Sequence, residues 1–141
     1  MFTSMFQASA GRPQQFANLY RQVGVETGVS TATPHRLVQM LFDALIDEIG
    51  HARAAMAQAR IEAKGRHIGR AVRIVDEGLR AGLNLQGGGE LAANLHSLYG
   101  YVTVRLTHAN LRNDVEALEE AHRLMEPLRD AWATIGTQLP S

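Results

Sequence analysis

The sequence predicts an all-α protein, folded as an antiparallel up-down-up-down four-helix bundle with a mobile N-terminal arm and a short cap segment. Apolar residues recur at helical spacing along four long segments. Short breaks rich in Gly, or in Asn and Asp, separate these segments. No strand-like alternation continues for more than a few residues. Because short connections favour antiparallel neighbours, the segments are expected to pack as an up-down-up-down bundle.

Chain length and composition narrow the classes of protein to which this chain can belong. Its 141 residues suit one domain with a real core. Lys plus Arg and Asp plus Glu number 14 each, so charge suggests neither nucleic acid nor an anionic membrane as partner. The absence of cysteine excludes disulfides, thiolate metal sites and a cysteine nucleophile. With no long apolar run and no secretory-signal pattern, we expect a cytoplasmic protein without membrane insertion.

Three regions are predicted along the chain. Residues 1–19 are rich in Ser, Gln and Ala and contain Pro13, so we expect a flexible arm there. Residues 20–136 form the bundle, and their first part, 20–32, is an extended or short helical cap segment. Residues 137–141 are a C-terminal tail.

The first helix has a clear predicted start. Thr33 suits the N-cap, and Pro34 suits the first helical position, where its missing N–H is not needed. The helix is expected to continue to about residue 60, with an apolar face covering about half of its circumference. That face comprises Leu37, Leu41, Phe42, Ala44, Leu45, Ile46, Ile49, Ala52, Ala55 and Met56.

The second and third helices differ in their apolar faces. The second, near residues 63–83, has one stripe and several glycines that weaken it. These glycines indicate either close packing between helices at small residues or a helix that can adjust to a partner. The third starts at Glu90 and has a core stripe and a second stripe on another side. The second stripe comprises Ala93, Tyr101, Val104 and Leu111. It indicates either burial on two sides of the helix or a groove that receives an amphipathic helix of a partner.

The polar cluster at residues 110–114 predicts the turn into the fourth helix. Asn113 is expected to be the N-cap, with Glu116 at the third helical position. Asp114 is expected in the first turn, where the helix dipole favours an acid. Asn110 is expected to bond carbonyls freed at the end of the third helix. The fourth helix spans about 114–135, with a kink near Pro127 or a break before it.

A di-metal carboxylate enzyme is the main enzymatic alternative. Two Glu-x-x-His pairs, Glu48 with His51 and Glu119 with His122, resemble the ligand pattern of such bundles. Glu119, however, lies opposite its helix's apolar stripe, whereas Glu48 faces inward and is expected to reach the edge or pair with a basic residue. We therefore predict no enzyme, no catalytic residue, no cofactor and no metal site. The basic residues Arg60, Lys64, Arg66, Arg70 and Arg73 are interpreted as a solvated face.

Several motifs resemble those of the flagellar secretion chaperone FliS family. They are "TATPHRLVQMLFDALI" at 31–46, "RAVRIVDEGLRAGL" in the second helix, and "NLHSLYGYVTVRLTHANLRNDVEALEE" with "DAWATI" in the third and fourth. The resemblance covers about residues 18–136 in order. It departs at Ala44, where the family usually has Gly, and at Val104-Arg105, where it often has Arg-Arg.

The resemblance implies a binding protein. Its family binds the disordered C-terminal segment of flagellin in hydrophobic surface grooves, prevents premature polymerisation and assists delivery to the flagellar type III secretion apparatus, whose components are possible further partners. Tyr20 matches a family tyrosine that packs over part of that surface. Candidate groove or cap residues are Tyr20, Val25, Leu41, Leu45, Ile74, Leu79, Tyr99 and Tyr101, each of which could equally be core. A bundle adaptor that self-associates through its apolar face remains an alternative.

Overall fold

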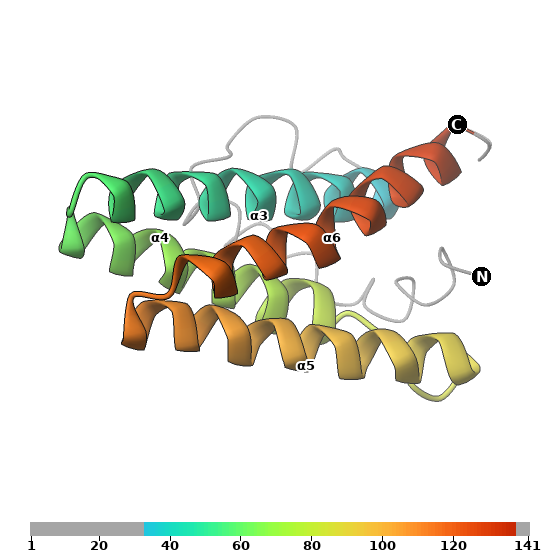
Figure 1. Cartoon of the computed structure of the whole chain (residues 1–141). Coiled ribbons are helices and arrows are strands. Elements are labelled where there is room, and N and C mark those ends of the chain that lie inside the picture. Colours follow the sequence, from blue (N-terminus) through green and yellow to red (C-terminus); the bar gives the residue numbers. More distant parts are fainter. Residues whose placement is uncertain (1–32, 138–141) are drawn as a thin grey trace.

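A computed structural model describes residues 33–137 of the chain as an antiparallel helical bundle (Figure 1). Its elements are α3 (Pro34–Ala57), α4 (Ile61–Arg73), the π-helix η1 (Ile74–Arg80), α5 (Gly89–Arg112) and α6 (Val115–Gly136). Successive helices alternate in direction, and no strand occurs within residues 33–137. The predicted all-α, up-down-up-down fold is confirmed. The predicted arm (1–19) and cap segment (20–32), and tail residues 138–141, lie outside the described residues.

Helix α3 begins as the sequence predicts. The Thr33 hydroxyl accepts a hydrogen bond from the Arg36 amide at 3.1 Å, and Pro34 occupies the first helical position. The helix ends at Ala57, slightly before the predicted residue 60. Ala59 in the following turn has a φ of 56°, a left-handed conformation that cannot continue an α-helix.

Helix α4 continues directly into η1, so the predicted second helix is one helical segment of two kinds. The helix turns wider from Ile74 onward, over a stretch that contains the buried Gly78. Arg73 pairs with Glu77, and Arg80 pairs with Asp76, on the exposed side of this stretch. The glycine content of residues 63–83 predicts a helix of reduced stability, but no sequence pattern predicts its π-helical part.

The turn between α5 and α6 corrects one predicted cap. Asn113 does not cap α6; it is the C-cap of α5, with a left-handed φ of 53° that Asn tolerates better than most residues. Asp114 is the N-cap instead, and its carboxylate accepts a hydrogen bond from the Glu116 amide at 3.0 Å. Glu116 is therefore two residues after the cap, and the predicted capping box is not formed. At Asn110, the described contact is made by its backbone carbonyl, which accepts from Lys64.

Helix α6 continues through Pro127, so the break considered for that position does not occur. Near its end, Trp132 is joined to the start of α3. The indole Nε1–H of Trp132 donates to the His35 carbonyl at 2.9 Å, and the His35 ring lies stacked on the indole at 4.6 Å between ring centroids. These contacts connect residues separated by 97 positions and hold one end of the bundle together.

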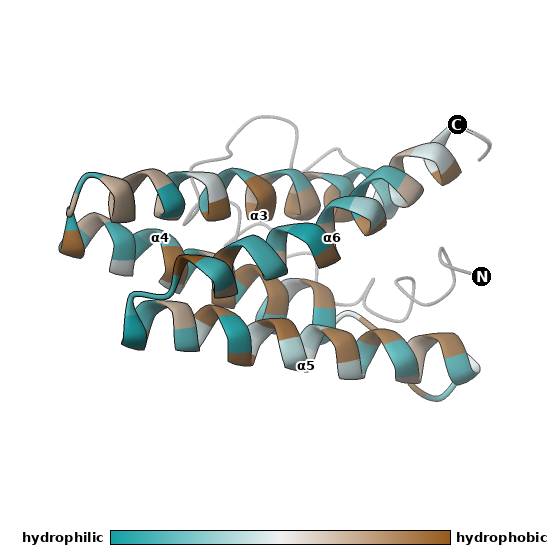
Figure 2. Ribbon diagram, in the orientation of Figure 1, coloured by the Kyte–Doolittle hydropathy of each residue, from teal (hydrophilic) through white to brown (hydrophobic). Residues whose placement is uncertain are grey.

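The core occupies the space between the helices, as their amphipathic colouring suggests (Figure 2). The wide apolar face predicted for α3 is almost entirely buried, with only Ile46 and Met56 partly exposed. At the end of the bundle opposite Trp132, Lys64 is only 7% exposed. Its ammonium donates to the carbonyl of Asn110 at 3.1 Å and to Oδ1 of Asn113 at 3.2 Å. The prediction that Lys64 belongs to a solvated face is therefore wrong.

Candidate functional site

The most prominent candidate site is an exposed apolar face of α5, which we define by Tyr101, Val104 and Leu111. These side chains are 45%, 63% and 77% exposed. They project from the side of α5 opposite the core residues Leu95, Tyr99, Val102 and Leu106, because the helix advances about 100° per residue. The second stripe predicted from sequence thus lies on the surface, which excludes its burial between helices.

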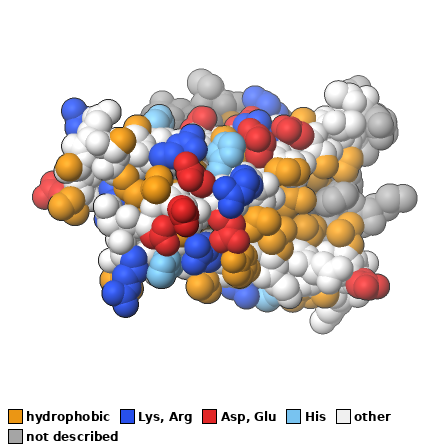
Figure 3. Space-filling model, in the orientation of Figure 1, with side chains coloured by type: hydrophobic (Ala, Val, Ile, Leu, Met, Phe, Trp, Pro, Cys, Tyr) orange, Lys and Arg blue, Asp and Glu red, His pale blue; other side chains and the backbone are white. Residues whose placement is uncertain are grey.

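Neighbouring apolar groups extend this surface. Val115, the first residue of α6, is also exposed. Leu98 of α5 and Leu124 and Leu128 of α6 are half-buried against the core. Figure 3 shows hydrophobic side chains gathered over the region where α6 diverges from α5, beside a cluster of charged side chains. The α5–α6 side of the molecule therefore offers apolar area with a charged border.

A polar cluster lies at the edge of the α5 apolar face. The Tyr101 hydroxyl donates to Glu120 of α6 at 2.8 Å, and Arg105 Nε donates to the other carboxylate oxygen of Glu120 at 2.6 Å. The hydrogen bond from Tyr101 lowers the pKa of Glu120, against a smaller opposing effect of desolvation and with help from Arg105. The same bond to Glu120 raises the pKa of the Tyr101 hydroxyl. Tyr101 is thus held in one orientation with its ring accessible.

The groove and cap candidates fall into three groups. Leu41, Leu45, Ile74, Leu79 and Tyr99 are buried members of the hydrophobic core, and burial raises the pKa of the Tyr99 hydroxyl. Tyr101 is exposed, on the α5 apolar face. Tyr20 and Val25 lie outside the described residues. Of the six described candidates, only Tyr101 is accessible to a partner in this conformation, and the role of all eight in binding stays a prediction.

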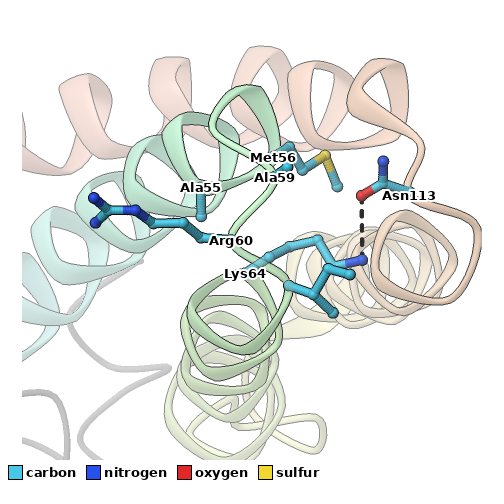
Figure 4. Close-up of a pocket in the computed structure, with 7 residues that line it drawn as sticks. Ala55, Met56, Ala59, Arg60, Lys64 and Asn113 are labelled. Atoms are coloured by element: carbon cyan, nitrogen blue, oxygen red, sulfur yellow. Dashed lines mark hydrogen bonds between the residues drawn. The ribbon is translucent and has the colours of Figure 1, made fainter.

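A hollow of about 350 Å³ opens at the end of the bundle where α3 and α4 join and α5 turns into α6. Ala55, Met56 and Ile61 supply apolar wall, and Lys64 and Asn113 supply a hydrogen-bonded polar side (Figure 4). The Arg60 side chain extends away from the other labelled residues. Ile61 beside this hollow is 74% exposed. Sequence reasoning missed the hollow, because residues from three separate segments form it.

The two Glu-x-x-His pairs do not come together within the described part of the chain. Glu48 is buried, and it pairs with His67 at 2.6 Å and with Arg70 at 3.8 Å, both from α4. Glu48 thus faces inward as expected. Of the two outcomes considered for it, reaching the edge or pairing with a basic residue of another helix, the structure shows the pairing. Glu119 is partly exposed and lies 4.0 Å from Arg53, while His122 lies 3.8 Å from Glu126. The second pair is thus engaged on the surface of α6.

Comparison with known proteins places the chain in a family. The family model described as flagellar protein FliS matches residues 16–139. The chain belongs to the FliS family. It is 45% identical to the flagellar secretion chaperone FliS of Salmonella typhimurium over 116 residues, which cover 82% of this chain and 86% of that protein.

Other FliS relatives match to a similar extent. The flagellar secretion chaperone FliS of Escherichia coli is 42% identical over 80% of this chain and 83% of its own length. The flagellar secretion chaperone FliSB of Pseudomonas aeruginosa is 42% identical over 80% of this chain and 89% of its own length. These FliS relatives are named as chaperones, which agrees with a binding protein. Within residues 33–137, none of the helices combines the length and the apolar character that a membrane crossing requires.

Proposed function

We propose that this member of the FliS family is a cytoplasmic export chaperone for flagellin. It binds the C-terminal segment of flagellin, which is disordered when free, and thereby prevents premature polymerisation and assists delivery to the flagellar type III secretion apparatus. The observation that carries this proposal is the exposure of the α5 apolar face. The formal net charge of the chain is zero, so net charge favours no charged partner in its place. An exposed apolar stripe along a helix suits an amphipathic partner helix.

The chemistry of the α5 apolar face fits a partner that must be bound and later released. Val104 and Leu111 provide apolar area, and the Tyr101 ring is fixed by its bond to Glu120. A disordered segment that becomes helical on this surface loses about 2–5 kcal/mol or more of the contact energy to ordering. Binding is therefore expected to remain reversible without ATP hydrolysis. We place the first contact at Tyr101 and propose Tyr20 and Val25 as parts of a cap over the flagellin site.

The test is calorimetric titration of the full chain with a peptide of the flagellin C-terminal segment. We expect a stable complex with a negative heat-capacity change, because apolar surface is buried. Replacing Val104 and Leu111 together by Glu should weaken binding at least tenfold, since each charge is placed where about 1–2 kcal/mol of apolar contact is lost.

Ala133→Glu is the matched control. Combined with Ala57→Glu, at the end of α3, it adds the same two negative charges at exposed positions outside the α5 apolar face and should leave binding unchanged. Absence of binding by the unaltered chain at tens of micromolar peptide would overturn the proposed function. Equal binding by the unaltered chain and the Val104→Glu/Leu111→Glu variant would overturn the assignment of the surface.

A further inference from the structure

Three side chains with metal-binding atoms gather between α3 and α4. Glu48 and His51 lie one helical turn apart on α3, and His67 reaches them from α4. Their ligand atoms all lie within 4.8 Å of one another, and the two imidazole rings are 5.0 Å apart between centroids. Two of these three residues, the Glu48-x-x-His51 pair, are recognisable as a motif in the sequence.

The charge and burial of Glu48 favour a cation at this place. Glu48 is 5% exposed, and its Oε1 already lies 2.6 Å from Nδ1 of His67. Its second oxygen, Oε2, lies 3.8 Å from Nη1 of Arg70. Ligating carboxylates are commonly held by such a neighbour, which fixes the orientation of the oxygen that binds the metal. The positive charge of Arg70 repels a metal cation bound at Glu48, so we expect the site to bind the metal with moderate affinity.

We propose that Glu48, His51 and His67 form a binding site for one divalent cation of the Zn²⁺ class. Two imidazoles and one carboxylate are a donor set that Zn²⁺ accepts, with bonds of about 2.0–2.2 Å. In a tetrahedral site the ligand atoms lie about 3.3 Å apart. The cation replaces the proton between Glu48 and His67, and the exposed His51 side chain turns toward them.

The surroundings leave space for a fourth ligand. A hollow of about 260 Å³ opens beside the cluster, and both His51 and His67 line it. Water or a group of a partner protein can therefore complete the coordination from the solvent side. The cation bridges α3 and α4 and stabilises their packing. This inference concerns a surface different from the α5 apolar face and does not depend on flagellin binding.

Binding of Zn²⁺ and Co²⁺ to the tag-free full chain tests the site. Calorimetry should give one Zn²⁺ per chain, and Co²⁺ should give visible absorption of a low-symmetry site that Zn²⁺ abolishes. Zn²⁺ should also raise the thermal unfolding midpoint, because it binds the folded chain.

His51→Ala is the principal variant, since His51 is exposed and its removal leaves the core intact. Losing a residue that merely orients a ligand commonly weakens metal binding about 10–100-fold, so losing His51 should weaken it at least tenfold. Glu48→Gln keeps the side-chain volume and should weaken binding similarly. His96→Ala, on α5, is the control and should bind as the unaltered chain does. Equal Zn²⁺ affinity of the unaltered chain and His51→Ala, or an equal loss with His96→Ala, would refute the site.

Discussion

At the scale of single residues, two adjacent residues form the turn between α5 and α6, one ending the first helix and the other starting the second. Asn113 adopts the left-handed conformation that ends α5, and Asp114 caps α6. Both residue types are good N-caps, so the sequence alone does not decide between them. The left-handed φ of Asn113 decides it, because an N-cap residue normally has an extended backbone.

Asp114→Ala should lower the free energy of unfolding by about 0.5–2 kcal/mol, because the Glu116 amide loses its acceptor. Urea unfolding followed by circular dichroism measures this. Asp114→Asn retains a capping oxygen and should recover most of the loss. The carboxylate also lies 3.3 Å from Nε2 of His108, a contact that Asn would weaken. An Ala variant as stable as the unaltered chain would show that this cap is not needed.

The lowered pKa of Glu120 makes the free energy of unfolding depend on pH. Its pKa is lower in the folded chain than the ordinary value of 4.5, chiefly because Tyr101 donates to it. At pH values between the folded pKa and 4.5, the unfolded chain therefore binds more protons at Glu120 than the folded chain does. The contribution of Glu120 to stability is complete above pH 4.5 and is lost as the pH falls through the folded pKa. Glu120→Gln should make the acid loss of stability shallower. Unfolding curves between neutral pH and pH 3 provide the measurement, and identical acid profiles for both chains would contradict the assignment.

At the scale of elements, long periodic segments were predictable and the contacts between them were not. The apolar spacing placed all four helices within a few residues, because burial of one face determines a helix. The burial of Lys64 and the contact of Glu48 with His67 depend on neighbouring helices. The π-helix is not visible in the apolar spacing, because that spacing shows only which face of the helix is buried. The sequence could not decide whether the α5 apolar face is exposed, for the same reason. A second apolar stripe on one helix does not reveal whether another helix covers it.

Trp132 tests how firmly α6 is joined to α3. Trp132→Phe removes the indole donor but keeps an aromatic ring beside His35. It should lower the free energy of unfolding by about 1 kcal/mol from the lost hydrogen bond, with a further loss from the smaller ring. Trp132→Ala should lower it by about 3–5 kcal/mol. Chemical unfolding of the three chains gives the comparison, and a Phe variant of unchanged stability would mean that the bond to the His35 carbonyl contributes nothing.

At the scale of the whole molecule, a neutral chain carries an exposed apolar surface. The sequence pI is about 7.0, so repulsion between copies is weakest near neutral pH. Reversible self-association through the α5 apolar face, the adaptor alternative, should therefore be strongest near pH 7 and decrease at higher pH.

Sedimentation at several concentrations measures this self-association. Val104→Glu should reduce it, and Ala133→Glu serves as the control for added charge. A strictly monomeric chain at all concentrations near pH 7 would exclude the adaptor alternative. A dimer that persists in Val104→Glu would place the self-association on another surface.

The position of Lys64 has a consequence for motion. One ammonium joins the first turn of α4 to the end of α5 and to the α5–α6 turn, while Trp132 fastens α6 to α3 at the far end. Helices usually fray from their ends, but here hydrogen bonds between helices hold both ends of the bundle. Amide hydrogens near residues 64 and 110–113 should thus exchange with deuterium more slowly than those of ordinary helix ends, and Lys64→Met should accelerate that exchange.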